Sequence, residues 1–158
     1  MTTAYLGLGA NLADRAGNLA EAVRRIASVD VRVLRVSSSW ETAPRGMLDQ
    51  PWFLNQVIEV ETDLSAVHLF QHVQEIEREM GRVRAERDGP RLIDIDILLY
   101  GDQRVSEPDL EIPHPRMAER RFVLEPLAEL APGLRHPVSG KTMQELLAEV
   151  MDQVARPV

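Results

Sequence analysis

The alternation of apolar and polar residues predicts a strand–helix–strand–strand order in the first part of the chain. A short apolar strand at 3–8 precedes a helix at 14–27, where apolar residues recur at helical spacing. A long or bent strand follows at 31–42 and becomes serine-rich towards its end. Two prolines and a glycine predict a loop at 43–52, and alternation resumes in a strand at 54–61.

A second helix and a fourth strand follow the same logic. Ser65 is a suitable N-cap for a helix that runs to Met80, and Gly81 is a natural stop. The strand at 92–100 is apolar enough for a central position in a sheet. Gly101 and Asp102 form a turn that favours a short hairpin after this strand.

The element order β-α-β-β-α-β predicts the fold class. It is the α/β (α+β) arrangement known as ferredoxin-like, a mainly antiparallel sheet flanked by helices. A C-terminal helical extension follows, in which Thr142 and Glu145 match the capping box of a last helix. At 158 residues we expect one domain, 1–158, which is large enough for a core of its own.

Composition and charge exclude several functional classes. With no cysteine, disulfides, thiolate catalysis and zinc–thiolate sites are excluded. The net charge of −7 argues against a general nucleic-acid or membrane surface, and no apolar run is long enough for a membrane span. We expect a cytoplasmic protein without nucleic-acid or membrane partners. Sequence does not settle the oligomeric state, for which a monomer is the expectation.

The candidate chemistry lies between residues 81 and 99. Asp94 and Asp96 are two apart in a predicted strand, so both carboxylates point to one face, with their Cα atoms roughly 6 to 7 Å apart. Mg²⁺ typically takes one or two carboxylates together with substrate phosphates. Guanidinium groups suit phosphate oxygens. Four arginines precede the aspartates: Arg82, Arg84, Arg87 and Arg91. The stretch indicates a polyphosphate held by metal and arginine.

Each candidate also has a structural interpretation. Two aspartates on a strand are often solvent-facing edge residues, although aspartate is disfavoured inside strands. Gln74 and Glu77 share one helix face, which is commonly a solvated face. His114 lies between prolines and suits a turn. Asn55 follows two aromatic residues and suits either a heteroaromatic ligand edge or a backbone partner.

Taken together, these segments resemble 6-hydroxymethyl-7,8-dihydropterin pyrophosphokinases, enzymes of folate biosynthesis. The similarity runs from Ala4 to about Pro137. It rests on YLGLGANL, ETAP with DQPWFLNQV, GRVR with GPRLIDIDILLYG, and IPHPRM with RRFVLEPLAELAP. The resemblance implies transfer of diphosphate from ATP to the pterin hydroxymethyl group, which yields AMP.

The resemblance also implies roles for individual residues. The implied metal ligands are Asp94 and Asp96, which would hold two Mg²⁺ ions. The implied catalytic residues are Arg82, Arg91, Asp94, Asp96 and Arg120. The implied ATP contacts are Gln74, Glu77, Arg82, Arg87, Arg91, His114 and Arg120. The implied pterin contacts are Thr42, Phe53, Asn55, Asp94 and Phe122. One aspartate would also assist deprotonation of the hydroxymethyl group.

Three positions depart from the family pattern. Asp88 stands where the family often has a tryptophan, Arg45 stands where an apolar residue is common, and Pro115 replaces an aromatic residue of some members. The loops at 43–52 and 81–91 are expected to order when substrates bind.

Two other functions stay open: a ligand-binding module without catalysis, and a Mg²⁺-dependent phosphodiesterase acting on nucleic acid. The net charge of −7 disfavours the second.

Overall fold

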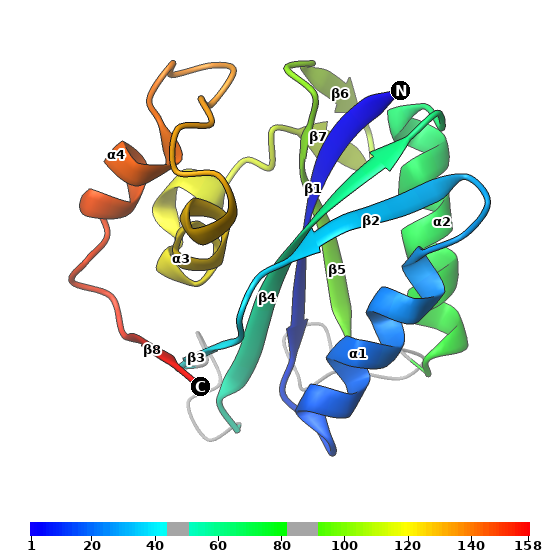
Figure 1. Ribbon diagram of the computed structural model, residues 1–158, viewed down its shortest axis with the longest axis horizontal. Coiled ribbons are helices and arrows are strands. Elements are labelled where there is room, and N and C mark those ends of the chain that lie inside the picture. The colour runs from blue at the N-terminus through cyan, green and yellow to red at the C-terminus, as the bar shows by residue number, and fades with distance from the viewer. Residues whose placement is uncertain (44–50, 82–91) are drawn as a thin grey trace.

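A computed structural model describes residues 1–43, 51–81 and 92–158 (Figure 1). The strands are β1 (Thr2–Ala10), β2 (Val31–Val36), β3 (Trp40–Thr42), β4 (Phe53–Thr62), β5 (Asp94–Tyr100), β6 (Val105–Glu107), β7 (Leu110–Ile112) and β8 (Ala155–Pro157). The helices are α1 (Arg15–Ile26), α2 (Ala66–Glu79), the 3-10 helix η1 (Met117–Glu119), α3 (Arg121–Leu130) and α4 (Met143–Ala148).

The described elements form three layers. The main sheet has the strand order β5-β1-β4-β3-β8, and β2 pairs with β4 beside β3. All of its pairings are antiparallel. Helices α1 and α2 cover one face, and α3 with α4 cover the other (Figure 1). β4 lies between β1 and β2, and β1 lies between β4 and β5. This is the split βαβ pattern, so the predicted ferredoxin-like α+β class is confirmed.

Alternation along the strands divides the buried side chains between the two faces of the sheet. Leu6 and Leu8 of β1 pack in the core under α1 and α2. Tyr5 of the same strand packs with Val57 of β4 in the core under α3 and α4. Both faces are therefore covered by helices.

Local caps confirm the predicted helix ends. The Ser65 hydroxyl accepts a hydrogen bond from the backbone N–H of His68 and begins α2. Gly81, one residue beyond the C-cap, has φ of +89°, a backbone conformation that glycine adopts without strain. Thr142 and Glu145 form the expected capping box at α4. These signals are local in sequence, so they can be recognised from the sequence alone.

The structure differs from the sequence-based prediction for one strand and for one hairpin. The strand expected over 31–42 is interrupted at 37–39, giving β2 and β3, because the Ser37 hydroxyl accepts the backbone N–H of Val57 in place of a regular ladder bond. The hairpin expected at Gly101 and Asp102 is wrong. The chain does turn there, but β6 pairs with β7 in a separate two-stranded sheet rather than with β5.

The position of β5 is also a correction. Its apolar sequence predicts a central strand, yet β5 stands at one end of the described sheet. The strand is apolar because it is covered on both faces. Ile95 and Ile97 pack in the core with α2 residues, while Leu98 and Leu99 pack in the core of α3 and α4. No helix among the described residues has the length and apolar character needed to cross a bilayer.

Candidate active site

Asp94 and Asp96 lie on the face of the sheet that α3 covers, next to two glycines. Asp94 pairs with Gly9 of β1, and Asp96 pairs with Gly7. On the far side of β1, Gly9 pairs with Asn55 of β4. Directly paired residues share a face, and neighbouring strands are about 4.8 Å apart. The backbones of Asp94 and Asn55 therefore stand about 10 Å apart across a residue that has no side chain.

Neighbouring side chains pack closely over both glycines, and a Cβ added to Gly7 would stand 3.4 Å from the Leu98 side chain. A Cβ added to Gly9 would stand 3.1 Å from Asn55 Oδ1 and 3.7 Å from the Phe53 ring. An alanine at this position would therefore crowd the amide. Gly7 and Gly9 had no predicted role, although glycine at every second position of an apolar strand (YLGLG) indicates close approach of other groups to the backbone.

Three of the predicted pterin contacts, Thr42, Phe53 and Asn55, lie on β3 and β4, where Asn55 pairs with Gly9. Asn55 and Thr42 are both about 5% exposed, and the Asn55 Nδ2 group donates to Thr42 Oγ1 at 2.7 Å. Thr42 in turn pairs with Phe53 across β3 and β4. A buried amide held by a hydroxyl next to a ring is suited to a flat ligand with a polar edge.

A second group of predicted residues comes from the segment between β7 and α3. The His114 backbone N–H donates to the Leu98 carbonyl at 3.0 Å, which ties this segment to β5 two residues beyond Asp96. The Arg120 guanidinium carbon lies 5.3 Å from the centroid of the Phe122 ring, within the range of a cation–π contact. His114 is thus tied to the strand that carries the aspartates, and the charges of both Asp96 and Arg120 act on its ring.

The charges around His114 bear on its protonation. Burial lowers the pKa of the His114 imidazole below its usual value. Asp96 opposes this lowering, and Arg120 and Arg116 add to it. The Nδ1 atom accepts the backbone N–H of Arg116 at 3.2 Å. At neutral pH the ring is therefore uncharged and carries its proton on Nε2, where it can donate a hydrogen bond.

Glu77 is buried against the strand that carries the aspartates. Its side chain is 6% exposed in α2, and its Oε2 accepts the backbone N–H of Ile95 at 2.8 Å. Ile95 lies between Asp94 and Asp96, so this bond holds the backbone from which both carboxylates project. The solvated face considered for Glu77 is therefore wrong, while Gln74 is half-buried. The ATP contacts expected of Gln74 and Glu77 stay predictions.

The remaining predicted residues fall outside the structure's described ranges. They are Arg82, Arg87 and Arg91, and with them the two departures Asp88 and Arg45. Most residues of the loops at 43–52 and 81–91 also lie outside the described ranges, so the ordering of these loops on substrate binding stays a prediction. Within the described residues no group of three or more His, Cys, Asp or Glu side chains is placed to hold a metal. Mg²⁺ is commonly held by one or two carboxylates together with substrate phosphates and water, which Asp94 and Asp96 would suit.

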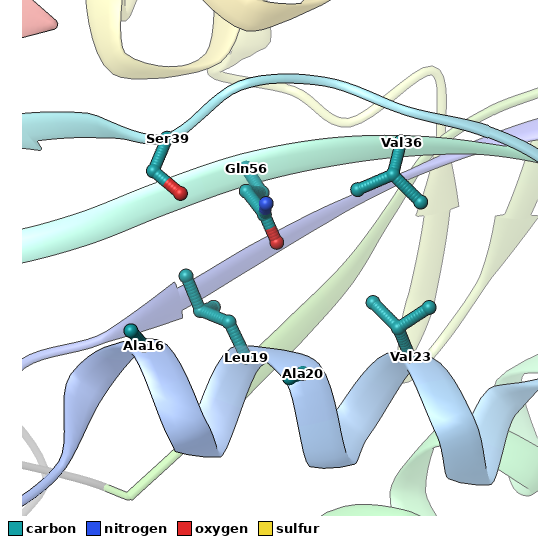
Figure 2. Close-up of a pocket in the computed structure, with 7 residues that line it drawn as sticks. All are labelled: Ala16, Leu19, Ala20, Val23, Val36, Ser39 and Gln56. Carbon is teal, nitrogen blue, oxygen red and sulfur yellow. The ribbon is translucent and has the colours of Figure 1, made fainter. Parts of the chain in front are cut away.

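A groove of about 380 Å³ lies on the opposite face of the sheet (Figure 2). It runs between α1 and the strands β2 and β4, and apolar side chains of α1 form one wall. The lining residues are Ala16, Leu19, Ala20, Val23, Val36, Ser39 and Gln56. None of these is a predicted site residue, so the groove is separate from the candidate active site.

Comparison with known families decides the assignment. The sequence model of the family described as 7,8-dihydro-6-hydroxymethylpterin-pyrophosphokinase (HPPK) matches residues 5–132, most of the chain. The chain belongs to the HPPK family. As an HPPK, it transfers diphosphate from ATP to the hydroxymethyl group of 6-hydroxymethyl-7,8-dihydropterin in tetrahydrofolate biosynthesis, and AMP is released. The resemblance read from the sequence is confirmed.

Curated relatives agree with this assignment. The chain is 46% identical over 151 residues to a 2-amino-4-hydroxy-6-hydroxymethyldihydropteridine pyrophosphokinase of Methylorubrum extorquens, covering 95% of this chain and 94% of the relative. It is 44% identical to the enzyme of the same name from Bacillus subtilis, covering 90% and 86%. An HPPK is an enzyme, so the alternatives of a binding module without catalysis and a nucleic-acid phosphodiesterase are not supported.

Solved structures share the fold. A Plasmodium falciparum HPPK-DHPS chain superposes with a TM-score of 0.77 at 16% identity, covering 96% of this chain and 46% of that one. At this identity the likeness shows the fold alone. The folic acid synthesis protein fol1 of Schizosaccharomyces pombe is 42% identical to this chain, which spans 21% of its length. Some relatives are therefore much longer proteins.

Proposed function

We propose that Asp94 and Asp96 hold two Mg²⁺ ions together with the phosphates of ATP, beside Gly7 and Gly9 of β1. The observation that carries this proposal is the row Asp94, Gly9, Asn55 across three strands. Asp94 stands at one end of this row, with Asp96 two residues along on the same face, and the buried amide of Asn55 stands at the other end. Carboxylate oxygens on one face are suited to Mg²⁺, which polarises phosphate oxygens and offsets their charge when it is bound.

The protein's own residues would position the two substrates. Asn55 and Thr42 would read the polar edge of the pterin, and Phe53 and Phe122 would contact its ring. Asp94, at the junction of the two halves, would also contact the pterin and is suited to accept the hydroxymethyl proton. Most of the catalysis would come from this alignment of the hydroxyl oxygen with the ATP phosphates.

Cationic and hydrogen-bonding groups would act on the ATP side. Arg120 would contact the phosphates, and the Nε2–H of His114 would donate to the nucleotide or its phosphates. Arg82, Arg87 and Arg91 are proposed to add positive charge as negative charge spreads over the transferred group. Gln74 and Glu77 complete the proposed ATP set. Neutral His114 supplies a donor without adding a further charge beside Arg120.

Substitution of the aspartates tests the proposal. Asp94→Asn and Asp96→Asn should each lower AMP formation from ATP and the pterin on the order of 10³-fold, because a charged ligand for Mg²⁺ is lost while the side-chain volume stays the same. Asp102→Asn, at an exposed turn just after β5, is the matched control and should keep its activity. Calorimetry with a non-hydrolysable ATP analogue, with and without Mg²⁺, measures the binding step. Unchanged turnover in either site variant would contradict the metal assignment.

The remaining expectations are part of the same proposal. We infer a single pyrophosphokinase domain over 1–158, acting as a cytoplasmic monomer on two small-molecule substrates. Pro115 follows His114 and is exposed, so an aromatic contact at that position is absent in this enzyme. Sedimentation of the purified protein tests the monomer directly.

A further inference from the structure

Four side chains join the C-terminal strand to the strands of the proposed pterin pocket. They are Arg15, Glu41, Trp52 and Arg156, here called the C-terminal clamp. Arg156 of β8 donates from Nε to Glu41 Oε1 at 2.9 Å, and its guanidinium carbon lies 4.2 Å from the centroid of the Trp52 ring. Arg15 donates to Glu41 Oε2 at 2.9 Å and to the Trp52 carbonyl at 3.0 Å. One carboxylate thus bridges two guanidinium groups.

The clamp lies on the other face of the sheet from the proposed pterin contacts. Glu41 pairs with Leu54, whose side chain belongs to the core under α1. Neighbours along a strand point to opposite faces. Thr42 follows Glu41 and Phe53 follows Trp52, and these two neighbours pair with each other. The clamp therefore contacts β3 and the start of β4 on the face opposite to the side chains of Thr42 and Phe53.

β3 and β8 are short strands that depend on side-chain contacts for their stability. β3 and β8 are three residues each, and such short pairings contribute little stability alone. β8 pairs with β3 through Trp40, Glu41 and Thr42, and the Val158 N–H donates to the Ser39 carbonyl at 3.2 Å. Without β8, β4 would be the only described strand that pairs with β3. The side chains of Glu41 and Arg15 are 20% and 29% exposed, so this ion pair is partly shielded from water, whereas the side chain of Arg156 is 60% exposed.

We propose that Arg156 is a positioning residue for the pterin pocket. Arg156 pairs with Glu41 and stacks on the Trp52 ring. These contacts keep β3 in register with β4, so that Thr42 stays within hydrogen-bond reach of Asn55. The proposal rests on the proposed pterin roles of Thr42, Phe53 and Asn55. It assigns a part in substrate recognition to the C-terminal strand, which among the described strands pairs with β3.

Steady-state kinetics with each substrate varied in turn test this. Arg156→Ala should raise the KM for the pterin about 10-fold, since small displacements of a binding group are costly, while the KM for ATP changes less than about twofold. Arg156→Lys should restore part of the loss, because it keeps the cation beside Glu41 but lacks the planar group over Trp52. Arg24→Ala is the control, since Arg24 also pairs with a glutamate but on the exposed face of α1. It should leave both KM values unchanged.

A double-mutant cycle separates the clamp from general destabilisation. Glu41→Gln should raise the KM for the pterin, and combining it with Arg156→Ala should add little, because the two residues act through one contact. Fully additive effects, or equal rises in both KM values, would overturn the proposal. Asn55→Ala is measured in parallel. If it raises the pterin KM and Arg156→Ala does not, only the clamp fails. If neither raises it, the proposed pocket itself fails.

Discussion

Replacing Glu77 by alanine should destabilise the fold and disturb the aspartate pair together. The Glu77 carboxylate accepts the Ile95 N–H at 2.8 Å from a position that is 6% exposed. In the described sheet β5 is an end strand, so no neighbouring strand takes this outward N–H. Alanine leaves a buried donor without the carboxylate, at the residue between Asp94 and Asp96.

The magnitude follows from the kind of bond. A hydrogen bond to a charged acceptor contributes about 1.5 to 3 kcal/mol, and a buried donor left without a partner costs a similar amount. We therefore expect Glu77→Ala to lower the free energy of unfolding by about 1.5 to 3 kcal/mol. Glu77→Gln keeps a carbonyl acceptor of the same reach and loses the charge. Its expected cost is about 1 kcal/mol.

Urea denaturation followed by circular dichroism measures both variants. With a denaturant slope of about 2 kcal/mol/M, the midpoint should fall by about 1 M for Glu77→Ala and by about half as much for Glu77→Gln. AMP formation should fall in the same order, since β5 then positions its carboxylates less well. A Glu77→Ala midpoint within about 0.25 M of the parent, the range of ordinary surface changes, would refute the reasoning.

Two further predictions concern the space beside Gly9 and the loss of folding stability at alkaline pH. Gly9→Ala should raise the KM for the pterin several-fold in steady-state assays, because its Cβ would stand 3.1 Å from Asn55 Oδ1. Gly133→Ala, where a Cβ meets nothing within 4 Å, should not, and an equal KM in both variants would contradict the crowding argument. Burial, and then the hydrogen bond to Glu59, raise the pKa of Tyr5 from 10.0 to about 12. The stability that depends on the neutral phenol is therefore complete below pH 10 and is lost as pH rises towards 12. Thermal melts across this range should show a steeper loss for the parent than for Tyr5→Phe, and parallel curves would argue against the shift.

Much of the fold was readable because its signals are local. The period of two in β1 and β4 and the helical period of α1 and α2 each involve residues only a few positions apart. The bent strand was predicted, but its break was not, since Ser37 replaces a ladder bond through a residue twenty positions away. The position of β5 was mispredicted for a related reason. Burial by helices on both faces and burial between two strands produce the same apolar sequence.

The candidate site divides in the same way. The shared face of Asp94 and Asp96 follows from strand geometry alone, and the structure confirms it. The contact of Glu77 with Ile95 did not follow, because helix periodicity says which residues share a face and not what that face meets. The family resemblance supplied the proposed roles of Asn55 and Thr42. Their 2.7 Å hydrogen bond then appeared only in the folded chain.

Most of the elements, the apolar faces of the strands and the family follow from the sequence alone, because short-range periodicity and contiguous motifs carry that information. The tertiary structure decided which distant segments meet. Gly9 separates Asp94 from Asn55 only because β1 lies between β4 and β5. Arg156 reaches Glu41, 115 positions earlier, only because β8 adds to the edge of β3. Such pairings are selected by the packing of the whole chain, since each contact gains its free energy only when the others have formed.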